Sequence, residues 1–474
     1  MFRTLWLIFF LALFTRTLFF FVALTESGSF TTAFPAFDGY YQLTENLLHG
    51  NGFSRDLAPP FVPDSIRTIL YPLLMAGLVY VFKSYGAVLI AQIILGSLIP
   101  LLGYKIAREL IPQRWVALAV AVVLAIEPFS VELTTTIRNE TLFTVLFLGS
   151  MAFFLDYWKN KRASVLAGSS LLLALATLAR PTTQYLPLLI IVTICYLLWR
   201  ERARALRHSA LFLVIFFAVL SPWMLRNFIL FHNPALSAQY ASVPFGYLLP
   251  SAIAFEKHQG FEEAKREFYA GEGQLANFED INLTNAPYYK QRAVELLKLH
   301  PVGALKSSGV TLLTFFTHDG YLDILYRVGA EPTLRLERPA FSLFFSSPLE
   351  TLARLRPLLL SPLLFVILGR LLWIGIALCF IIGTLRYLKA PQERAKGIFV
   401  LLIIAYFVLT TVAVGLSVNA RFRFPVNAFI LVFAVYGIHG LTEKYGTRRN
   451  ANFSTASKES ELAPVTNVEE IPQP

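Results

Sequence analysis

Apolar runs close to twenty residues long recur along this 474-residue chain, and they constrain its fold more than any other feature. A helix needs about 20 apolar residues to cross the roughly 30 Å hydrocarbon core of a bilayer, whereas strands buried in a soluble core are much shorter. The composition agrees, because 56% of the residues are hydrophobic and only 15% are charged. These runs predict an all-α fold, a polytopic bundle of membrane helices.

About ten of the runs are long enough to be predicted as membrane spans. The first, residues 5–24, is too long and too aromatic for a signal-peptide core, and no small-residue cleavage pattern follows it, so we expect it to be retained. The other predicted spans are approximately residues 86–104, 115–126 (extending a little in both directions), 141–157, 163–179, 182–199, 209–225, 361–385, 397–416 and 424–441. Two shorter apolar stretches, 68–82 and 304–316, are expected to lie in the interface or to re-enter from outside.

Basic residues in the short loops predict the orientation of these spans. If each span crosses once, one side collects Lys105, Arg108, Arg114, Lys159, Lys161, Arg162, Arg200, Arg202, Arg204, Arg207, Arg386, Lys389, Arg394, Lys396, Lys444, Arg448 and Arg449. The positive-inside rule makes that side cytoplasmic and places both termini there. We therefore expect a multi-pass protein of the inner (plasma) membrane. The net charge of +11 follows from these loops and does not indicate nucleic-acid binding.

This topology divides the chain into four parts. Residues 1–225 form an N-terminal transmembrane catalytic module, whose first external loop is 25–85. Residues 226–360 form a large extracytoplasmic segment with amphipathic helices, and residues 361–441 form the C-terminal transmembrane helices. The tail, 442–474, is poor in large apolar residues, which predicts a disordered cytoplasmic segment.

The first external loop carries a carboxylate close to the membrane. It begins "FPAFDGYYQLTENLLHGNGFS", which places Asp38 just beyond the first span. A carboxylate so near hydrocarbon is costly unless it faces a polar cavity or has a function. Asp38 is either an interfacial cap or a general base, because partial desolvation can raise the pKa of a carboxylate towards working pH. Tyr40 and Tyr41, which follow it, are candidate supporting residues.

Arg67, in "PDSIRTILYPLLMAGLVYVF", begins the apolar stretch 68–82. The backbone N–H groups at the start of a helix favour an anion. The arginine fork can bind phosphate through two hydrogen bonds. Arg67 is therefore a candidate phosphate ligand, with snorkelling of its side chain to the interface as the alternative.

The external turn "EPFSVELTTTIRNETLFTVLF" is unusually rich in charge and carries Glu127, Glu132, Arg138 and Glu140. Glu140 lies at the start of the returning helix, where a carboxylate interacts favourably with the helix dipole. It either caps that helix or is a second acidic residue that faces Asp38 across a cavity.

Further arginines lie at the external ends of helices, against the positive-inside trend. They are Arg180 in "TLARPTTQY", Arg226 in "SPWMLRNF", and Arg421 and Arg423 in "NARFRFPVN". Their positions at the ends of different helices predict a site for a strongly anionic ligand at the membrane surface. The alternation of Arg and Phe also offers aromatic faces to a lipid or a sugar ring.

The order of these charged segments and apolar runs along the chain resembles that of the GT-C superfamily of membrane glycosyltransferases. The similarity is to the bacterial branch that contains protein O-mannosyltransferases, the aminoarabinose transferase of lipid A and the Rhizobium-type lipopolysaccharide sugar transferases. It rests on "FDGYYQLTENLLHGNGFS", "RTILYPLLMAGLVYVFKSYG", "NETLFTVLFLGSMAFFL", "LATLARPTTQYLPLLI", "SPWMLRNFILF" and "ARFRFPVNAFILVFAVYGI". The resemblance extends up to about residue 441.

The resemblance implies transfer of a sugar from a polyprenyl-phosphate-linked donor to a protein, lipid A or polysaccharide acceptor on the extracytoplasmic face. It implies that Asp38 is the catalytic base, Glu140 a second acidic residue and Arg67 a ligand of the carrier phosphate, to which we add Arg138, Arg421 and Arg423, with Arg180 and Arg226 as supporting candidates. It implies inversion at the anomeric carbon if displacement is direct, and no requirement for a divalent metal or other cofactor.

The chain departs from the pattern of this branch at two positions. Gly39 follows Asp38 where many members have an acidic pair, and Thr68 follows Arg67 where two prolines are frequent.

The two cysteines, Cys195 and Cys379, lie in apolar runs. This position predicts that they are packing residues and that they form no disulfide or metal site.

The chemistry is consistent with the resemblance, because a sugar on a lipid phosphate is already activated. The protein need only position the acceptor, remove its proton and stabilise the departing phosphate.

One alternative function is that of a transporter or flippase of lipid-linked substrates. That function predicts inverted repeats and broken helices, and no repeat is evident in the sequence. The others are an O-antigen ligase or polymerase, whose main arginines lie in one late loop, and a scaffold. The sugar and the acceptor stay open.

Overall fold

The computed structural model describes residues 2–34, 37–271, 280–330 and 361–440, and within these ranges it contains helices and no strand. Six helices are long and apolar enough to cross a membrane. They are α1 (Phe2–Ser27), α5 (Gly86–Leu110), α8 (Glu140–Asn160), α11 (Arg202–Phe231), α20 (Leu363–Leu388) and α21 (Arg394–Val412). The predicted all-helical, polytopic membrane architecture is confirmed. The predicted tail, 442–474, lies outside the described residues.

A seventh span forms if two consecutive helices, α6 (Arg114–Ile126) and α7 (Pro128–Thr134), are counted together across a bend of 55°. The three remaining predicted spans correspond to shorter apolar helices. They are α9 (Ala163–Ala179), the stretch Pro181–Leu197 and the last helix, Phe424–Gly440. The stretch Pro181–Leu197 consists of a 3-10 turn followed by α10 (Leu186–Leu197). At about 1.5 Å per residue, a 17-residue helix is several ångströms shorter than the hydrocarbon core. The described chain therefore has six or seven full-length spans where the sequence predicted about ten.

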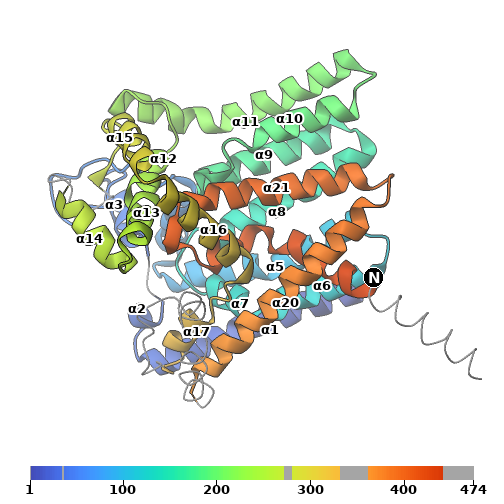
Figure 1. Ribbon diagram of the computed structural model, residues 1–474, viewed down its shortest axis with the longest axis horizontal. Helices are drawn as coiled ribbons and strands as arrows, with labels where there is room; N and C mark the ends of the chain where they lie inside the picture. Colours follow the sequence, from blue (N-terminus) through green and yellow to red (C-terminus); the bar gives the residue numbers. More distant parts are fainter. Residues whose placement is uncertain (1, 35–36, 272–279, 331–360, 441–474) are drawn as a thin grey trace, which may run out of the picture.

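The long helices lie alongside one another across Figure 1, from α11 at the top to α1 at the bottom. The short helices gather at the left end of the bundle, and the N-terminus is marked at the other end. They include α2 (Phe30–Ala33), α3 (Tyr40–Leu48), α12 (Gln239–Val243), α13 (Leu249–Lys257), α14 (Phe261–Gly271), α15 (Ala286–Leu299), α16 (Pro301–Thr317) and α17 (Tyr321–Arg327). The two stretches expected to be interfacial form α4 (Leu70–Phe82) and α16.

The bend between α6 and α7 has a local cause. Pro128 has no N–H, so it cannot donate to the carbonyl of Leu124, and the helix breaks there. Glu127 caps the new helix by accepting hydrogen bonds from the N–H groups of Phe129 and Ser130, at 3.2 and 2.7 Å. Arg16, which is fully buried in α1, donates to the freed carbonyls of Leu124 and Ala125 at 3.4 and 3.1 Å, and this satisfies acceptors that water cannot reach.

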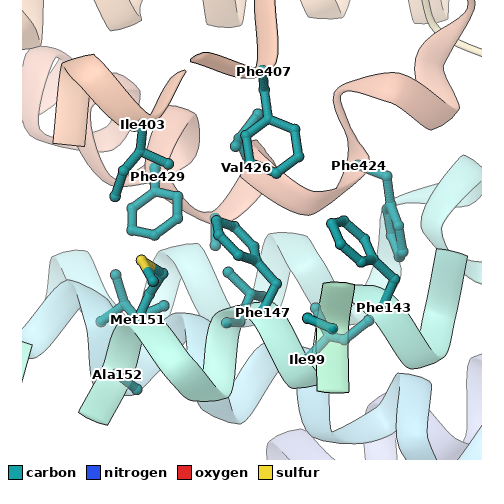
Figure 2. Close-up of a cluster of buried hydrophobic side chains, with 14 of the residues drawn as sticks. Ile99, Phe143, Phe147, Met151, Ala152, Ile403, Phe407, Phe424, Val426 and Phe429 are labelled. Carbon is teal, nitrogen blue, oxygen red and sulfur yellow. The ribbon is translucent and has the colours of Figure 1, made fainter. Parts of the chain in front are cut away.

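A buried aromatic cluster holds α8 against the C-terminal helices. Phe143, Phe147 and Met151 recur every four residues and therefore share one face of α8. Figure 2 shows this face packed against α21 and the last helix, where the ring of Phe147 lies 5.1 Å from that of Phe407. The packing places the beginning of α8 and the beginning of the last helix at the same end of the bundle.

The segment 226–360, which the sequence predicts to be extracytoplasmic, contributes a second hydrophobic cluster, built mainly from α12–α15 and including Ile66 from the loop 25–85. Three hydrogen bonds tie that loop to it. The Ser237 hydroxyl donates to the Ile66 carbonyl at 2.6 Å, the Ala238 N–H to the Ser65 carbonyl at 2.8 Å, and the Leu283 N–H to the Ser65 hydroxyl at 3.0 Å. The backbone immediately before Arg67 is therefore held by a segment more than 150 residues away in the chain.

Candidate active site

A cavity of about 390 Å³ brings together residues from five distant parts of the chain. The predicted site residues that line it are Asp38, Tyr40, Arg67, Arg138, Glu140, Arg180 and Arg421. These side chains come from the loop 25–85, the turn before α8, the end of α9 and the turn before the last helix. The predicted convergence of acidic and basic side chains is thus present in the structure.

Asp38 and Arg67 form the closest charged pair in this cavity. Arg67 Nη2 donates to Asp38 Oδ1 at 3.0 Å, and Arg67 Nε donates to the Asp38 carbonyl at 3.0 Å. The Arg67 N–H in turn donates to Asp64 Oδ1 at 2.8 Å. Since the guanidinium holds both the side chain and the backbone of Asp38, the pair is fixed in direction as well as in distance.

The backbone at Asp38 and Gly39 accounts for the missing second carboxylate. Both residues have left-handed φ angles, 67° and 75°. A Cβ at Gly39 would lie 2.6 Å from Cδ of Arg55, whose guanidinium is paired with Asp64. A side chain at Gly39 would therefore be strained by its φ angle and would displace Arg55, and both effects disfavour the acidic pair that many members of the resembled branch carry.

Glu140 is the first residue of α8 and is 2% exposed. Its Oε1 lies 3.5 Å from Arg180 Nη1 and 3.9 Å from Arg421 Nη1. Arg421 Nη1 also lies 3.9 Å from Asp38 Oδ2, so Arg421 stands between the two carboxylates. Within the described residues, Glu140 Oε2 is buried without a hydrogen-bond partner. A ligand bound in the cavity would satisfy this oxygen by donating a hydrogen bond to it.

Aromatic rings support the guanidinium groups of the cavity. The Arg138 guanidinium lies 3.7 Å above the ring of Phe37, and those of Arg180 and Arg421 lie 5.3 and 5.0 Å from the ring of Phe422. These contacts hold the groups in place without using their N–H donors. Arg138 Nε and Arg421 Nε are buried and have no hydrogen-bond partner among the described residues, which leaves donors for an anion.

The charges of the cavity do not cancel, because four arginines face two carboxylates. Burial by itself would raise the pKa of Asp38, but the nearby arginines, Arg67 first among them, outweigh it and hold that pKa below its ordinary value. This corrects the expectation that desolvation raises the pKa of Asp38. The carboxylate is instead kept ionised, and the surplus positive charge fits an anionic ligand.

Of the two candidate tyrosines, only Tyr40 lines the cavity. Its ring packs edge-on against Tyr71 at 4.8 Å, and burial raises the pKa of its phenol. Tyr41 points elsewhere: its hydroxyl donates to the Phe34 carbonyl at 3.2 Å, and its ring packs against Tyr85 at 4.6 Å. Tyr41 therefore supports the wall of the site.

Arg423 does not reach the cavity, although it lies two residues from Arg421. It is 1% exposed and donates to the carbonyls of Phe315 and His318, both at 2.8 Å, and its guanidinium lies 3.5 Å from the centre of the Trp373 ring. These contacts join α16 and α20 to the turn before the last helix. The structure thus gives Arg423 a packing role in place of the predicted phosphate contact.

Arg226 also lies outside the cavity. Its Nη1 donates to the Asp64 carbonyl at 2.9 Å, and its guanidinium lies 4.6 Å from the centre of the Trp223 ring. It therefore holds the same loop that positions Arg67.

The other two carboxylates of the charged turn before α8 also lie outside the cavity. Glu127 caps α7, and Glu132 pairs with Arg327 at 3.0 Å.

Five uncharged polar residues that the sequence did not single out also line the cavity, and they are Asn139, Gln239, Tyr247, Ser417 and Asn419. Gln239 and Tyr247 come from the segment predicted to be extracytoplasmic, where nothing in the sequence pattern marks them. Asn419 had a local signal, because its Oδ1 accepts from the Arg421 N–H at 3.1 Å and caps the short turn that carries Arg421. Among the described residues, no three His, Cys, Asp or Glu side chains form a group that could hold a metal ion.

Comparison with known proteins adds one match. Residues 67–225 match the sequence profile of the family described as dolichyl-phosphate-mannose-protein mannosyltransferase. The matched stretch contains Arg67, Arg138, Glu140 and Arg180, whereas Asp38 and Arg421 lie outside it. No curated protein matches the chain. The resemblance drawn from the sequence is confirmed over this stretch: residues 67–225 are similar to the dolichyl-phosphate-mannose-protein mannosyltransferase family, a family of GT-C membrane glycosyltransferases.

Proposed function

We propose that this glycosyltransferase moves a sugar from a polyprenyl-phosphate donor to a nucleophilic acceptor at the cavity end of the helical bundle. The family description names a lipid-phosphate-linked mannose, which makes mannose the first sugar to test. The observation that carries the proposal is the cavity itself, in which four arginines surround two carboxylates at one end of a bundle of membrane helices.

In this proposal the donor phosphate binds the surplus arginines, and Asp38 removes the acceptor proton. The bond between the anomeric carbon and the phosphate oxygen breaks, and its electron pair stays on the phosphate. The acceptor oxygen forms the new bond to that carbon while its proton passes to Asp38. Arginine charge stabilises the second negative charge that develops on the departing lipid phosphate. Glu140 orients Arg180 and Arg421 by pairing with both.

The low pKa of Asp38 is compatible with a base, because donor binding changes its surroundings. A phosphate that binds Arg67 and Arg421 shares the charge that now stabilises the Asp38 carboxylate and adds a negative charge beside it. Both effects raise the pKa of a carboxylate. Asp38 is therefore expected to become more basic when the donor is bound.

This sequence of events predicts two different pH profiles. kcat/KM reports the free enzyme and kcat reports the enzyme with its donor bound. Because the free Asp38 has a depressed pKa, its carboxylate stays ionised until the pH falls through that value. The acid limb of kcat/KM is expected below about pH 4, and the acid limb of kcat at a higher pH. An acid limb of kcat/KM at or above that of kcat would contradict this account.

We also propose the topology that the basic loops predict, with about ten crossings, both termini in the cytoplasm and the cavity outside. α8 supports it, because it begins with Glu140 in the cavity and ends in a turn that contains Lys159. Likewise α21 begins at Arg394 and ends shortly before Val414, a cavity residue. Helices of this length span about 30 Å, which separates their basic ends from the cavity by the thickness of a bilayer.

Cysteine accessibility tests this topology. In a variant with Cys195 and Cys379 replaced by alanine, we expect Glu263→Cys on α14 to react with a membrane-impermeant maleimide in intact cells. The matched variant, Lys389→Cys after α20, is expected to react only after permeabilisation. Both side chains are exposed, so access depends on the side of the membrane alone. The reverse pattern would contradict the proposed orientation.

The reaction is tested with purified protein, radiolabelled polyprenyl-phosphate mannose and membranes from cells that lack the protein as the source of acceptor. We expect the label to move from the lipid to a lipid-free or differently linked product, with GDP-mannose unused as a donor. A set of polyprenyl phosphates that carry other sugars tests which sugar is accepted. A flippase would move the labelled lipid across a bilayer without cleaving it, and that outcome, or use of the nucleotide sugar alone, would end the proposal.

A further inference from the structure

Outside the cavity, Arg327 at the end of α17 makes an extensive set of contacts near the site. It is 11% exposed and lies between the first external loop and the turn that follows α7. Its guanidinium lies 5.2 and 5.4 Å from the centres of the Phe19 and Phe34 rings. It is absent from the lining of the cavity, so it does not contact a ligand bound there.

The two ends of the Arg327 guanidinium hold two different segments. Nη1 donates to Glu132 Oε1 at 3.0 Å and to the hydroxyls of Thr135 and Thr136 at 3.0 and 2.9 Å. Nη2 donates to the carbonyls of Ala33 and Thr135 at 2.9 and 3.2 Å. The planar guanidinium group can bind two partners at a fixed separation, whereas the compact ammonium group of a lysine cannot.

Each of these segments leads directly into the proposed active site. Ala33 ends α2, shortly before Asp38. Thr136 lies just before Arg138 and Glu140, in the turn between α7 and α8. The backbone of that turn is held on its other side by Gln92, whose Nε2 donates to the Thr136 carbonyl at 2.8 Å. Arg327 thus links the loop of Asp38 directly to the turn of Glu140, on the far side of Thr136 from the contact between Arg138 and Phe37.

We infer that Arg327 is a positioning residue, whose guanidinium sets the separation between Asp38 and the Arg138–Glu140 turn from outside the cavity. The inference rests on the proposed function. A displacement of about 1 Å in a reacting group can lower a rate by about 10²-fold. Two of the four cavity arginines, Arg180 and Arg421, lie on segments that Arg327 does not contact, and Arg67 is held by Asp64 in a later part of its loop than Ala33. Loss of Arg327 should therefore impair turnover more than donor binding.

The test compares Arg327→Met and Arg327→Lys with wild type, using the matched control Arg266→Met on the exposed face of α14. We expect kcat for polyprenyl-phosphate mannose to fall about 10- to 100-fold in both Arg327 variants, with KM for the donor changed less than about threefold. The control should match wild type. The lysine variant keeps the charge but cannot hold both segments, so full activity in Arg327→Lys would overturn the inference.

A second measurement separates positioning from loss of folded protein. The stoichiometry and affinity of citronellyl phosphate, a short prenyl monophosphate, are measured by calorimetry on each variant. We expect one binding site per chain and unchanged affinity beside the lowered kcat. A stoichiometry that falls in proportion to kcat would mean that Arg327 only maintains the fold, and would overturn the inference. If wild-type protein uses no polyprenyl-phosphate sugar, the proposed function fails and the inference fails with it.

Discussion

Asp38→Asn is expected to lower the turnover of polyprenyl-phosphate sugar by about 10²- to 10⁴-fold, the usual contribution of a general base. The substitution preserves the size of the side chain, and the amide oxygen can still accept from Arg67 Nη2. It removes the negative charge and the ability to take up the acceptor proton. The protein should therefore remain folded while the chemical step is lost.

The measurement is the initial rate of donor consumption by each variant after a check of thermal unfolding in detergent. Asp156→Asn near the other end of α8 is the matched control, because its carboxylate lies at the end of the helix remote from the cavity. We expect the control to retain wild-type turnover. Equal turnover by wild type and Asp38→Asn would remove Asp38 from the mechanism and leave Glu140 as the candidate base.

Arg421→Met and Arg423→Met are expected to fail in different ways, although the two residues are separated by a single phenylalanine. Arg421 lines the cavity between two carboxylates and has a buried Nε without a partner in the described chain. A charge-assisted hydrogen bond contributes about 1.5–3 kcal/mol. Loss of Arg421 should therefore raise KM for the donor by about 10- to 150-fold with little effect on stability.

Arg423 has the opposite profile. Its removal leaves the buried carbonyls of Phe315 and His318 without their donors, and each unsatisfied buried group costs about 1–3 kcal/mol. Arg423→Met should lower the free energy of unfolding by about 2–6 kcal/mol, measured by denaturant titration in mixed micelles. Its folded fraction should bind the donor with near wild-type KM. A large KM effect in Arg423→Met, or a large stability loss in Arg421→Met, would contradict these roles.

The helical membrane architecture was readable from local pattern alone. Runs such as 86–104 and 141–157 identify helices because a bilayer penalises every unpaired backbone group, and a continuous apolar helix is the simplest way to pair them all. The structure lengthens several of these helices, for example α5 to Leu110 and α11 from Arg202 to Phe231, because charged residues can continue a helix beyond the apolar core. Hydropathy reports the apolar part of a helix and not its ends.

Much of the candidate site was also readable, since charge at the external end of a membrane helix is costly and therefore informative. That argument found Asp38, Arg67, Arg138, Glu140, Arg180 and Arg421, all of which line one cavity. It could not separate Arg421 from Arg423, because both have the same chemistry and nearly the same position. Packing against Trp373 and the carbonyls of α16 and the turn after it separates them.

Local pattern thus accounts for which segments are helical and which ends of them carry charge, because both depend on short-range cost in a bilayer. The pKa direction of Asp38 depends on how many guanidinium groups surround it, and these come from residues up to 383 positions away in the chain. The bridging contacts of Arg327 depend on where α17 docks between two loops near the other end of the sequence. Both are sums over long-range neighbours, and only the folded chain brings those neighbours together.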